Sequence, residues 1–216
     1  MSRTKIGVLI SGSGTNLQSI INNITTGNIN GEITVVISNK KEAYGLERAR
    51  QHNIDAVFVN QKDFENLEQF NDVLIEKLEN HGVELVILAG YLKILSKKFI
   101  SLYKNRIINI HPSLIPSFCG KGYYGIKVHE AAINYGVKVS GATVHFVDEE
   151  ADNGPIIMQE SVHLDYEDTA ETLQNKILKI EHKILPLAVK YYCEGKLKVV
   201  GRKVIIVENE ELKNNK

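Results

Sequence analysis

The segment NIHPSLIP, residues 109–116, places two side chains that could take part in polar catalysis two positions apart. Asn109 offers an amide that can donate hydrogen bonds, and His111 offers an imidazole that can carry a proton near neutral pH. If residues 106–111 form a strand, both side chains point to the same face and meet over one small volume. Pro112 favours an extended His111 and ends the strand in a loop. A strand end closed by a capping histidine and a turn proline is the alternative.

A loop rich in glycine and hydroxyl groups, SGSGTN at residues 11–16, follows the first apolar segment and opens an amphipathic helix at Leu17. Glycines let the backbone approach an anion closely, and the unpaired N–H groups of a helix N-terminus favour negative charge. Leu17 stands where a dinucleotide fingerprint has its third glycine, and no Gly-Lys-Ser/Thr of a triphosphate loop is present. The loop therefore predicts a site for a single phosphate group, at the carboxyl edge of an α/β sheet. An ordinary capped turn is the alternative.

Four acidic residues stand within residues 148–152, just before the turn Asn-Gly-Pro. On a solvated loop such charges cost little, so we expect solvent exposure for the first three, Asp148, Glu149 and Glu150. Asp152 differs because the turn that follows it can hold it rigidly. A carboxylate beside an imidazole favours the charged ring and can relay a proton through water. We expect His145 to be packed or hydrogen-bonded beside the site and not to be a catalyst.

The elements that must position these groups follow a βαβ rhythm in the first half of the chain. Strand-like segments lie at residues 5–10, 32–38, 56–60, 84–88 and 106–111, and helix-like segments at 16–24, 44–52 and 64–81. Right-handed crossovers then place helices on both faces of a largely parallel sheet.

The second half of the chain follows a different pattern. We expect a helix at 127–135, strands at 142–147 and 155–162, a long helix that begins near Asp168–Thr169 and runs toward Gly195, and a hairpin at 197–207. Asp168 and Glu171 have the spacing of a capping box. The sequence thus predicts an α/β fold whose sheet becomes mixed toward the C-terminus. We assign residues 1–207 to one domain and 208–216 to a charged tail.

Composition narrows the partners and the setting. The 216 residues hold 26 basic and 26 acidic side chains, so the protein lacks the net positive field of a dedicated nucleic-acid binder. Cys119 and Cys193 lie far apart, which suggests neither a zinc site nor a disulfide framework and fits a reducing cytoplasm. No leader or membrane-spanning stretch is evident. We therefore expect a cytoplasmic protein that binds neither nucleic acid nor membranes.

Six motifs, in order and over nearly the whole chain, resemble those of the folate-dependent formyltransferases, particularly members that act in purine biosynthesis. They are ISGSGTNLQSII, SNK with YGLERAR, LAGYLKILS, NIHPSLIPSF, VHFVDEEADNGPIIMQ and EHKILP. The resemblance implies a Rossmann-like formyltransferase fold. It also implies transfer of a formyl group from 10-formyltetrahydrofolate to the glycine amine of 5-phosphoribosylglycinamide, without a metal. Such a protein acts on small molecules as a monomer or weak homodimer.

The resemblance also assigns roles to residues at matching positions. It makes Asn109, His111 and Asp152 the catalytic trio, with a water beside Thr143 in the proton path. It places the ribonucleotide phosphate and ribose at Gly14, Thr15, Asn16 and Leu17, and the glycinamide at Glu181. It assigns the folate to Leu92, Lys93, Ile94, Leu95, Asn109 and the backbone of Asp148, Glu149, Glu150, Ala151 and Asp152.

Several points stay open. Glu181 shares a helical stripe with Ile177, Ile184 and Ala188, yet it could also pair with a lysine at the edge of that stripe. Residues 92–95 could instead be the apolar start of a helix. The long loop at 117–127 and the apolar Leu178 depart from the family pattern, so the phosphate contacts are incomplete.

Rival functions are a methionyl-tRNA formyltransferase, a hydrolase that passes the formyl group to water, and a non-catalytic nucleotide-binding module. The first carries an extra C-terminal domain and the second an N-terminal one. We expect no room for either, because the first strand begins near Lys5 and little follows the last helix. The third would not need Asn109, His111 and Asp152 together.

Overall fold

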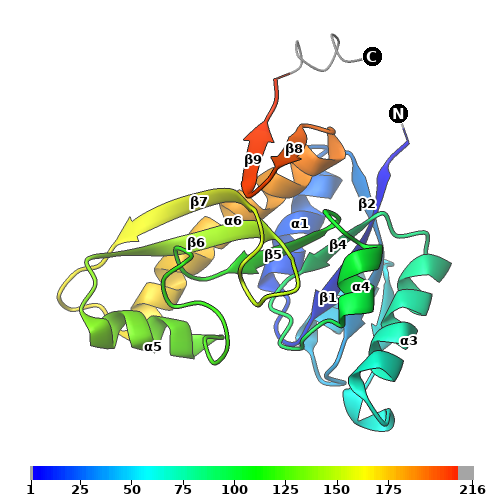
Figure 1. The fold of residues 1–216 in the computed structure, drawn as a ribbon, viewed down its shortest axis with the longest axis horizontal. Helices are drawn as coiled ribbons and strands as arrows, with labels where there is room; N and C mark the ends of the chain where they lie inside the picture. The colour runs from blue at the N-terminus through cyan, green and yellow to red at the C-terminus, as the bar shows by residue number, and fades with distance from the viewer. Residues whose placement is uncertain (1, 209–216) are drawn as a thin grey trace. The chain divides into compact units, whose positions relative to one another are not determined.

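The computed structural model describes residues 2–208, so the predicted charged tail lies outside the described residues apart from Glu208. Contacts divide the chain into two compact units, one ending at Asn109 and the next beginning at Ile110. Figure 1 shows the elements of both units along the chain.

The first unit is built on parallel strands in the order β3-β2-β1-β4-β5. The strands are β1 Thr4–Ile10, β2 Gly31–Ser38, β3 Asp55–Phe58, β4 Leu85–Leu88 and β5 Ile107–His111. The last two residues of β5 belong to the second unit. Strand β4 is buried along its whole length, as expected for a parallel strand covered on both faces.

Helices cover the strands of the first unit in two pairs. They are α1 Thr15–Thr25, α2 Tyr44–Gln51, α3 Leu67–Asn80 and α4 Lys97–Leu102, with a short 3-10 turn η1 Gln61–Asp63 before α3. Helix α1 packs beside α2. Helix α3 packs beside α4 (Figure 1). Because the strand order reverses direction after β3, right-handed crossovers place the two pairs on opposite faces.

The second unit is mixed. Its elements are α5 Ile126–Tyr135, β6 Val139–Phe146, β7 Ile156–His163, α6 Ala170–Cys193, β8 Leu197–Val200 and β9 Lys203–Ile206. Strand β6 pairs antiparallel with β7, β7 pairs parallel with β9, and β8 pairs antiparallel with β9. Helix α6 packs against β6, β7 and α5. The prediction of an α/β fold that is parallel first and mixed later is confirmed.

Several predicted boundaries are wrong by a few residues for local reasons. Helix α3 begins at Leu67 and not at residue 64, because the side chain of Asn66 accepts a hydrogen bond from the backbone of Gln69 and caps the helix there. Helix α4 went unpredicted, and Ser96 caps it in the same way. The predicted capping box of α6 is also wrong, because Thr169 and Thr172 form it.

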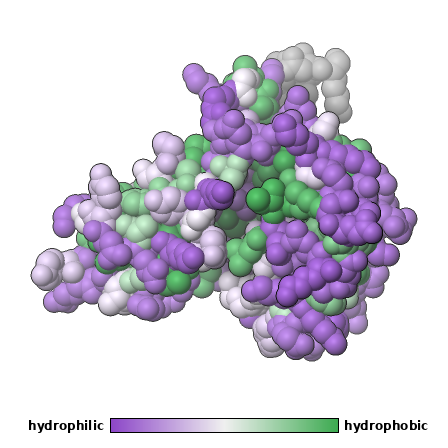
Figure 2. Space-filling view, turned by 60° about the horizontal axis from the view of Figure 1, so that its bottom comes forward, coloured by the Kyte–Doolittle hydropathy of each residue, from purple (hydrophilic) through white to green (hydrophobic). Residues whose placement is uncertain are grey.

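Most of the face shown in Figure 2 is hydrophilic, and apolar residues are exposed at scattered positions on it. None of the helices between residues 2 and 208 is long and apolar enough to span a bilayer.

Candidate active site

Strand β5 carries the side chains of the NIHP motif. Register with β4 pairs Leu88 with Asn109, and the strand continues to His111 before Pro112 ends it. Asn109 is half-buried and His111 is only 5% exposed. Residues two apart on a strand share a face, so the amide and the ring lie on the same side of β5.

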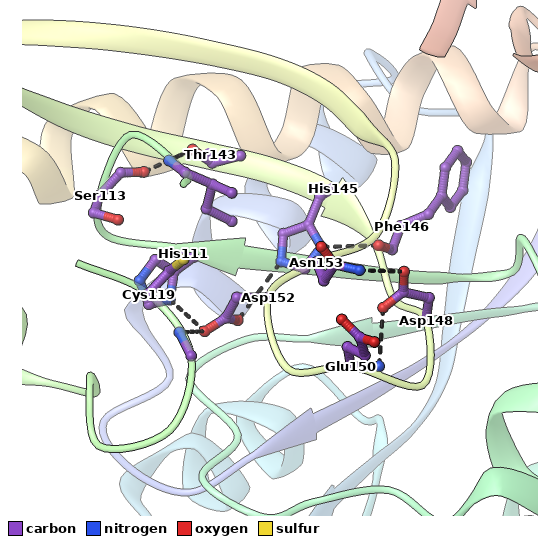
Figure 3. Close-up of polar contacts among 12 residues, drawn as sticks. His111, Ser113, Cys119, Thr143, His145, Phe146, Asp148, Glu150, Asp152 and Asn153 are labelled. Atoms are coloured by element: carbon purple, nitrogen blue, oxygen red, sulfur yellow. Dashed lines mark hydrogen bonds and ion pairs between the residues drawn. The ribbon is translucent and has the colours of Figure 1, made fainter. Parts of the chain in front are cut away.

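The imidazole of His111 lies beside the carboxylate of Asp152, as Figure 3 shows. Nδ1 of His111 is 3.4 Å from Oδ2 of Asp152, and the same oxygen accepts a 2.9 Å hydrogen bond from the backbone N–H of Gly120. Both side chains are largely shielded from water, with 6% and 16% exposed, so their interaction is weakly screened. Residues 41 positions apart in the sequence thus meet.

The other ring nitrogen of His111 is also engaged. Nε2 lies 2.9 Å from the backbone carbonyl of Phe118, which can only accept a hydrogen bond. A hydrogen-bond acceptor therefore lies beside each ring nitrogen of His111, the Phe118 carbonyl at Nε2 and the Asp152 carboxylate at Nδ1.

A second histidine, His145, lies on the other side of Asp152. It is almost fully buried, and its Nδ1–H donates to the carbonyl of Phe146 at 2.8 Å, which fixes the ring (Figure 3). Its Nε2 is 3.8 Å from Oδ1 of Asp152. Burial lowers the pKa of His145, so this ring favours the neutral form. As predicted from the sequence, His145 is packed beside the site.

The loop between β6 and β7 is built to hold Asp152 in place. Asp152 itself has a left-handed backbone with φ of 53°, a conformation that aspartate tolerates better than most residues. Asp148 accepts hydrogen bonds from the backbone N–H of Glu150 and the amide of Asn153 (Figure 3). A Cβ at Gly154 would lie 1.8 Å from the carbonyl oxygen of Phe146, so only glycine fits there. Of the first three acids, Glu149 and Glu150 are exposed as expected, whereas Asp148 is half-buried.

Thr143 does not have the role expected from the sequence. Its hydroxyl donates to the carbonyl of Ser113 at 2.6 Å and accepts from the backbone of Ile115 and the amide of Gln159 at 3.1 and 2.9 Å. One donor and two acceptor sites are then all used, so no capacity remains for a water. Thr143 instead fixes the loop that follows His111.

His129 on α5 is a residue that sequence reasoning missed. Its side chain is 2% exposed, and Nδ1 has no hydrogen-bond partner among residues 2–208. Burial, with a smaller contribution from the nearby charge of His111, lowers the pKa of His129 to about 4. On α5, His129 follows Val128 and lies one turn before Ala132, and both of these apolar residues are buried. This helical spacing is the sequence feature that could have placed His129 on the inward face.

Cys119 lies in the loop next to Asp152. Burial, and then the charge of Asp152, raises the pKa of this thiol. Because the thiolate is the reactive form, Cys119 is a poor nucleophile at neutral pH.

The predicted phosphate loop lies in the first unit and opens α1. The N-cap is Gly14, with φ of 71°, so no side chain caps the helix there. Thr15, Asn16 and Leu17 form the first turn, and Leu17 is fully buried. Glycine is itself a common N-cap residue, so this geometry agrees with the alternative of an ordinary capped turn as well as with a phosphate loop.

Residues 92–95, assigned to the folate, lie in the loop between β4 and α4. The alternative of a helix start is wrong, since α4 begins at Lys97. Leu92 and Ile94 expose 47% and 75% of their surface, whereas Leu95 is buried and Lys93 is half-buried.

Glu181 lies on α6 in the second unit and is only 8% exposed. Ile177, Ile184 and Ala188 of the same stripe are buried, as the helical spacing predicted. The half-buried Leu178 lies one turn earlier. Within residues 2–208, no three histidine, cysteine or carboxylate side chains form a group that could hold a metal ion.

Comparison with known proteins supports the sequence-based prediction. The model of the formyl transferase family matches residues 4–189. The chain is 43% identical over 195 residues to a phosphoribosylglycinamide formyltransferase of Haemophilus influenzae, which covers 90% of both chains.

Solved structures agree. A glycinamide ribonucleotide transformylase 1 from Symbiobacterium toebii superimposes with a TM-score of 0.91 and 44% identity, covering 96% of this chain and 95% of that one. A formyltetrahydrofolate deformylase from Pseudomonas syringae gives a TM-score of 0.86 at 26% identity, covering 95% of this chain and 66% of that one. The chain belongs to the formyl transferase family.

Proposed function

We propose that this enzyme transfers the formyl group of 10-formyltetrahydrofolate to the glycine amine of 5-phosphoribosylglycinamide, a step of purine biosynthesis. The observation that carries this choice of substrates is the likeness to phosphoribosylglycinamide formyltransferases along nine-tenths of both chains. Residues 1–207 would act as one domain, because the family match runs through both compact units.

The reaction begins when the amine attacks the formyl carbon. A C–N bond forms, the carbonyl oxygen becomes negatively charged, and the amine nitrogen gains a positive charge. A protonated His111 and the amide of Asn109 would donate hydrogen bonds to that oxygen. Each donor of this kind typically accelerates the reaction by about 10²–10³.

The second half of the reaction moves a proton. Asp152 would hold His111 in its charged form, and a water near this pair would carry the proton from the attacking amine to N10 of the folate. The C–N10 bond then breaks, giving formylglycinamide ribonucleotide and tetrahydrofolate. The poorly reactive thiol of Cys119 supports direct transfer without a covalent enzyme intermediate.

The Phe118 carbonyl must move for this chemistry. It accepts a hydrogen bond from Nε2–H of His111, while the Asp152 carboxylate lies 3.4 Å from Nδ1. We infer that the substrates displace the Phe118 carbonyl and that the developing oxyanion takes its place. This gives the loop at 117–127 a role that the family resemblance could not supply.

Binding is assigned by unit. In the first unit, Gly14, Thr15, Asn16 and Leu17 would hold the ribonucleotide phosphate and ribose, while the loop with the exposed Leu92 and Ile94 would contact the folate. In the second unit, Glu181 would face the glycinamide, and the backbone of residues 148–152 would contact the folate. We propose a monomer or weak homodimer. Both cysteines are free thiols, which supports a cytoplasmic setting.

A substrate-dependence assay tests the proposal. Purified protein is given 10-formyltetrahydrofolate and, in separate reactions, 5-phosphoribosylglycinamide, initiator methionyl-tRNA or no acceptor, and tetrahydrofolate is measured. We expect turnover only with phosphoribosylglycinamide. Turnover with no acceptor would instead indicate a deformylase, the activity named for one structural neighbour. Turnover with the tRNA would indicate a tRNA formyltransferase.

A further inference from the structure

Helix α2 donates two hydrogen bonds to carbonyl groups of the predicted phosphate loop, residues 11–16. The backbone N–H of Gly45 donates to the carbonyl of Gly12 at 3.1 Å, and Nε–H of Arg48 donates to the carbonyl of Ser13 at 2.9 Å. Gly45 is the second residue of α2, where a backbone N–H has no partner within the helix. The loop therefore satisfies a donor that α2 would otherwise leave unpaired.

The loop and α2 pack closely against each other at Gly14 and Gly45. A Cβ at Gly14 would lie 2.7 Å from Cα of Gly45, and one at Gly45 would lie 3.2 Å from Cα of Gly14. Glycine inside a helix costs about 1 kcal/mol relative to alanine. Its presence at Gly45 is explained by close packing against both the loop and β1, because a Cβ there would also lie 2.4 Å from Cδ1 of Ile10.

Arg48 joins three parts of this arrangement. In addition to Ser13, it donates through Nη1 to Oε1 of Gln18 on α1 at 3.1 Å, and its guanidinium lies 4.9 Å from the ring centre of Tyr44. Two N–H groups of the guanidinium and its contact with the Tyr44 ring thus orient the planar group toward the loop.

The two carbonyl contacts determine where the loop N–H groups point. In a planar trans peptide, the C=O and the N–H point in opposite directions. Since the carbonyls of Gly12 and Ser13 face α2, the N–H groups of the next residues, Ser13 and Gly14, face away from it. Two successive N–H groups beside a left-handed glycine at a helix N-terminus form an anion cradle.

We propose that Arg48 is a positioning residue for phosphate binding, which acts by holding the Ser13 carbonyl so that the loop N–H groups face the substrate phosphate. The inference rests on the proposed function. It assigns Arg48 a role in recognising the phosphorylated substrate and none in binding the folate or in the chemical step.

Arg48→Met tests the proposal, because methionine keeps an unbranched side chain while removing all five donors. Arg50→Met is the matched control, since Arg50 lies on the same helix, is exposed and pairs only with Glu47 in the described contacts. The measurements are KM for each substrate, kcat, and the inhibition constant of ribose 5-phosphate against phosphoribosylglycinamide.

For Arg48→Met we expect about a tenfold rise in KM for phosphoribosylglycinamide and in the inhibition constant of ribose 5-phosphate. KM for the folate and kcat should stay within about twofold, as should every constant of Arg50→Met. An unchanged ribose 5-phosphate constant would overturn the inference, and so would equal rises in both substrate KM values, which indicate general damage. If the wild-type enzyme does not use phosphoribosylglycinamide at all, the proposed function itself fails.

Discussion

Among single residues, Asp152 links several groups, because one carboxylate faces His111, His145 and the N–H of Gly120. We predict that Asp152→Asn lowers kcat by about 10²–10³ and changes either KM by only a few fold. In the proposed mechanism Asp152 supports His111 as a donor to the developing oxyanion, and loss of one such donor typically lowers the rate by about 10²–10³. Steady-state kinetics measure the effect.

Glu130→Gln serves as the control for Asp152→Asn. It removes one carboxylate charge from an exposed position of α5 and should leave the kinetics unchanged. A kcat for Asp152→Asn within threefold of the wild type would remove the carboxylate from the mechanism.

Thr143 carries a separate prediction about stability. Thr143→Val has nearly the same shape but leaves the Ser113 carbonyl and the Ile115 N–H without their hydroxyl partner. We expect the free energy of unfolding to fall by roughly 2–4 kcal/mol, as measured with urea. Thr26→Val, at an exposed helix end, should change it by less than about 1 kcal/mol. Similar losses in both variants would contradict the network.

Side-chain chemistry explains which site residues could be predicted from the sequence. Asn109, His111 and Asp152 stand in motifs whose residue types suggest a reaction. The Phe118 carbonyl and the Gly120 N–H are backbone groups, which almost any residue could supply. Their contacts with His111 and Asp152 therefore could not be predicted from residue types. Thr143 was noticed but misassigned, because its partners lie 30 and 28 positions away in the chain.

At the level of elements, the turn between β6 and β7 sets the position of Asp152. Gly154→Ala would place a Cβ within 1.8 Å of the Phe146 carbonyl, so the backbone must move. We predict a loss of about 3 kcal/mol in the free energy of unfolding, together with most of the transfer activity. Urea unfolding and steady-state assays measure the two effects, and a variant with wild-type values in both would show that the loop does not need this glycine.

Element types were easier to predict than their ends. The sequence predicted every strand of the parallel half, because short apolar runs mark buried strands, whereas apolar residues three or four positions apart mark amphipathic helices. Ends depend on single caps. Asn66 starts α3 later than its apolar pattern suggested, and Thr169 and Thr172 form the capping box of α6 in place of Asp168 and Glu171. The six-residue α4 was missed because it is too short to show a period.

For the whole molecule, acid stability depends on buried histidines. The pKa of His129 is lowered from 6.5 to about 4, so below pH 6.5 the unfolded chain binds a proton that the folded chain does not. Stability then rises with pH in this window, and acidification from pH 6.5 to 4 removes up to about 3 kcal/mol. His145 acts in the same direction.

His129→Gln tests this account, because glutamine does not titrate. Urea unfolding at pH 7.5, 5.5 and 4.5 should show a shallower loss of stability for the variant than for the wild type. Parallel pH dependences would mean that His129 does not contribute.

The succession of βαβ units made the parallel first half and mixed second half predictable at this scale. Packing distances were not predictable, since they arise from the fold. The approach of Gly14 to Gly45 is an example, joining residues 31 positions apart through two glycines that look ordinary in the sequence.

The most direct test of the central claim follows the formyl carbon in a single turnover. Enzyme is mixed with 10-formyltetrahydrofolate labelled with ¹³C in the formyl group and with phosphoribosylglycinamide, and the labelled product is identified by NMR. We predict that the wild type places the label in the amide of formylglycinamide ribonucleotide, while His111→Ala transfers it at least 10²-fold more slowly. Label that appears as formate, or transfer by His111→Ala at the wild-type rate, would contradict the account.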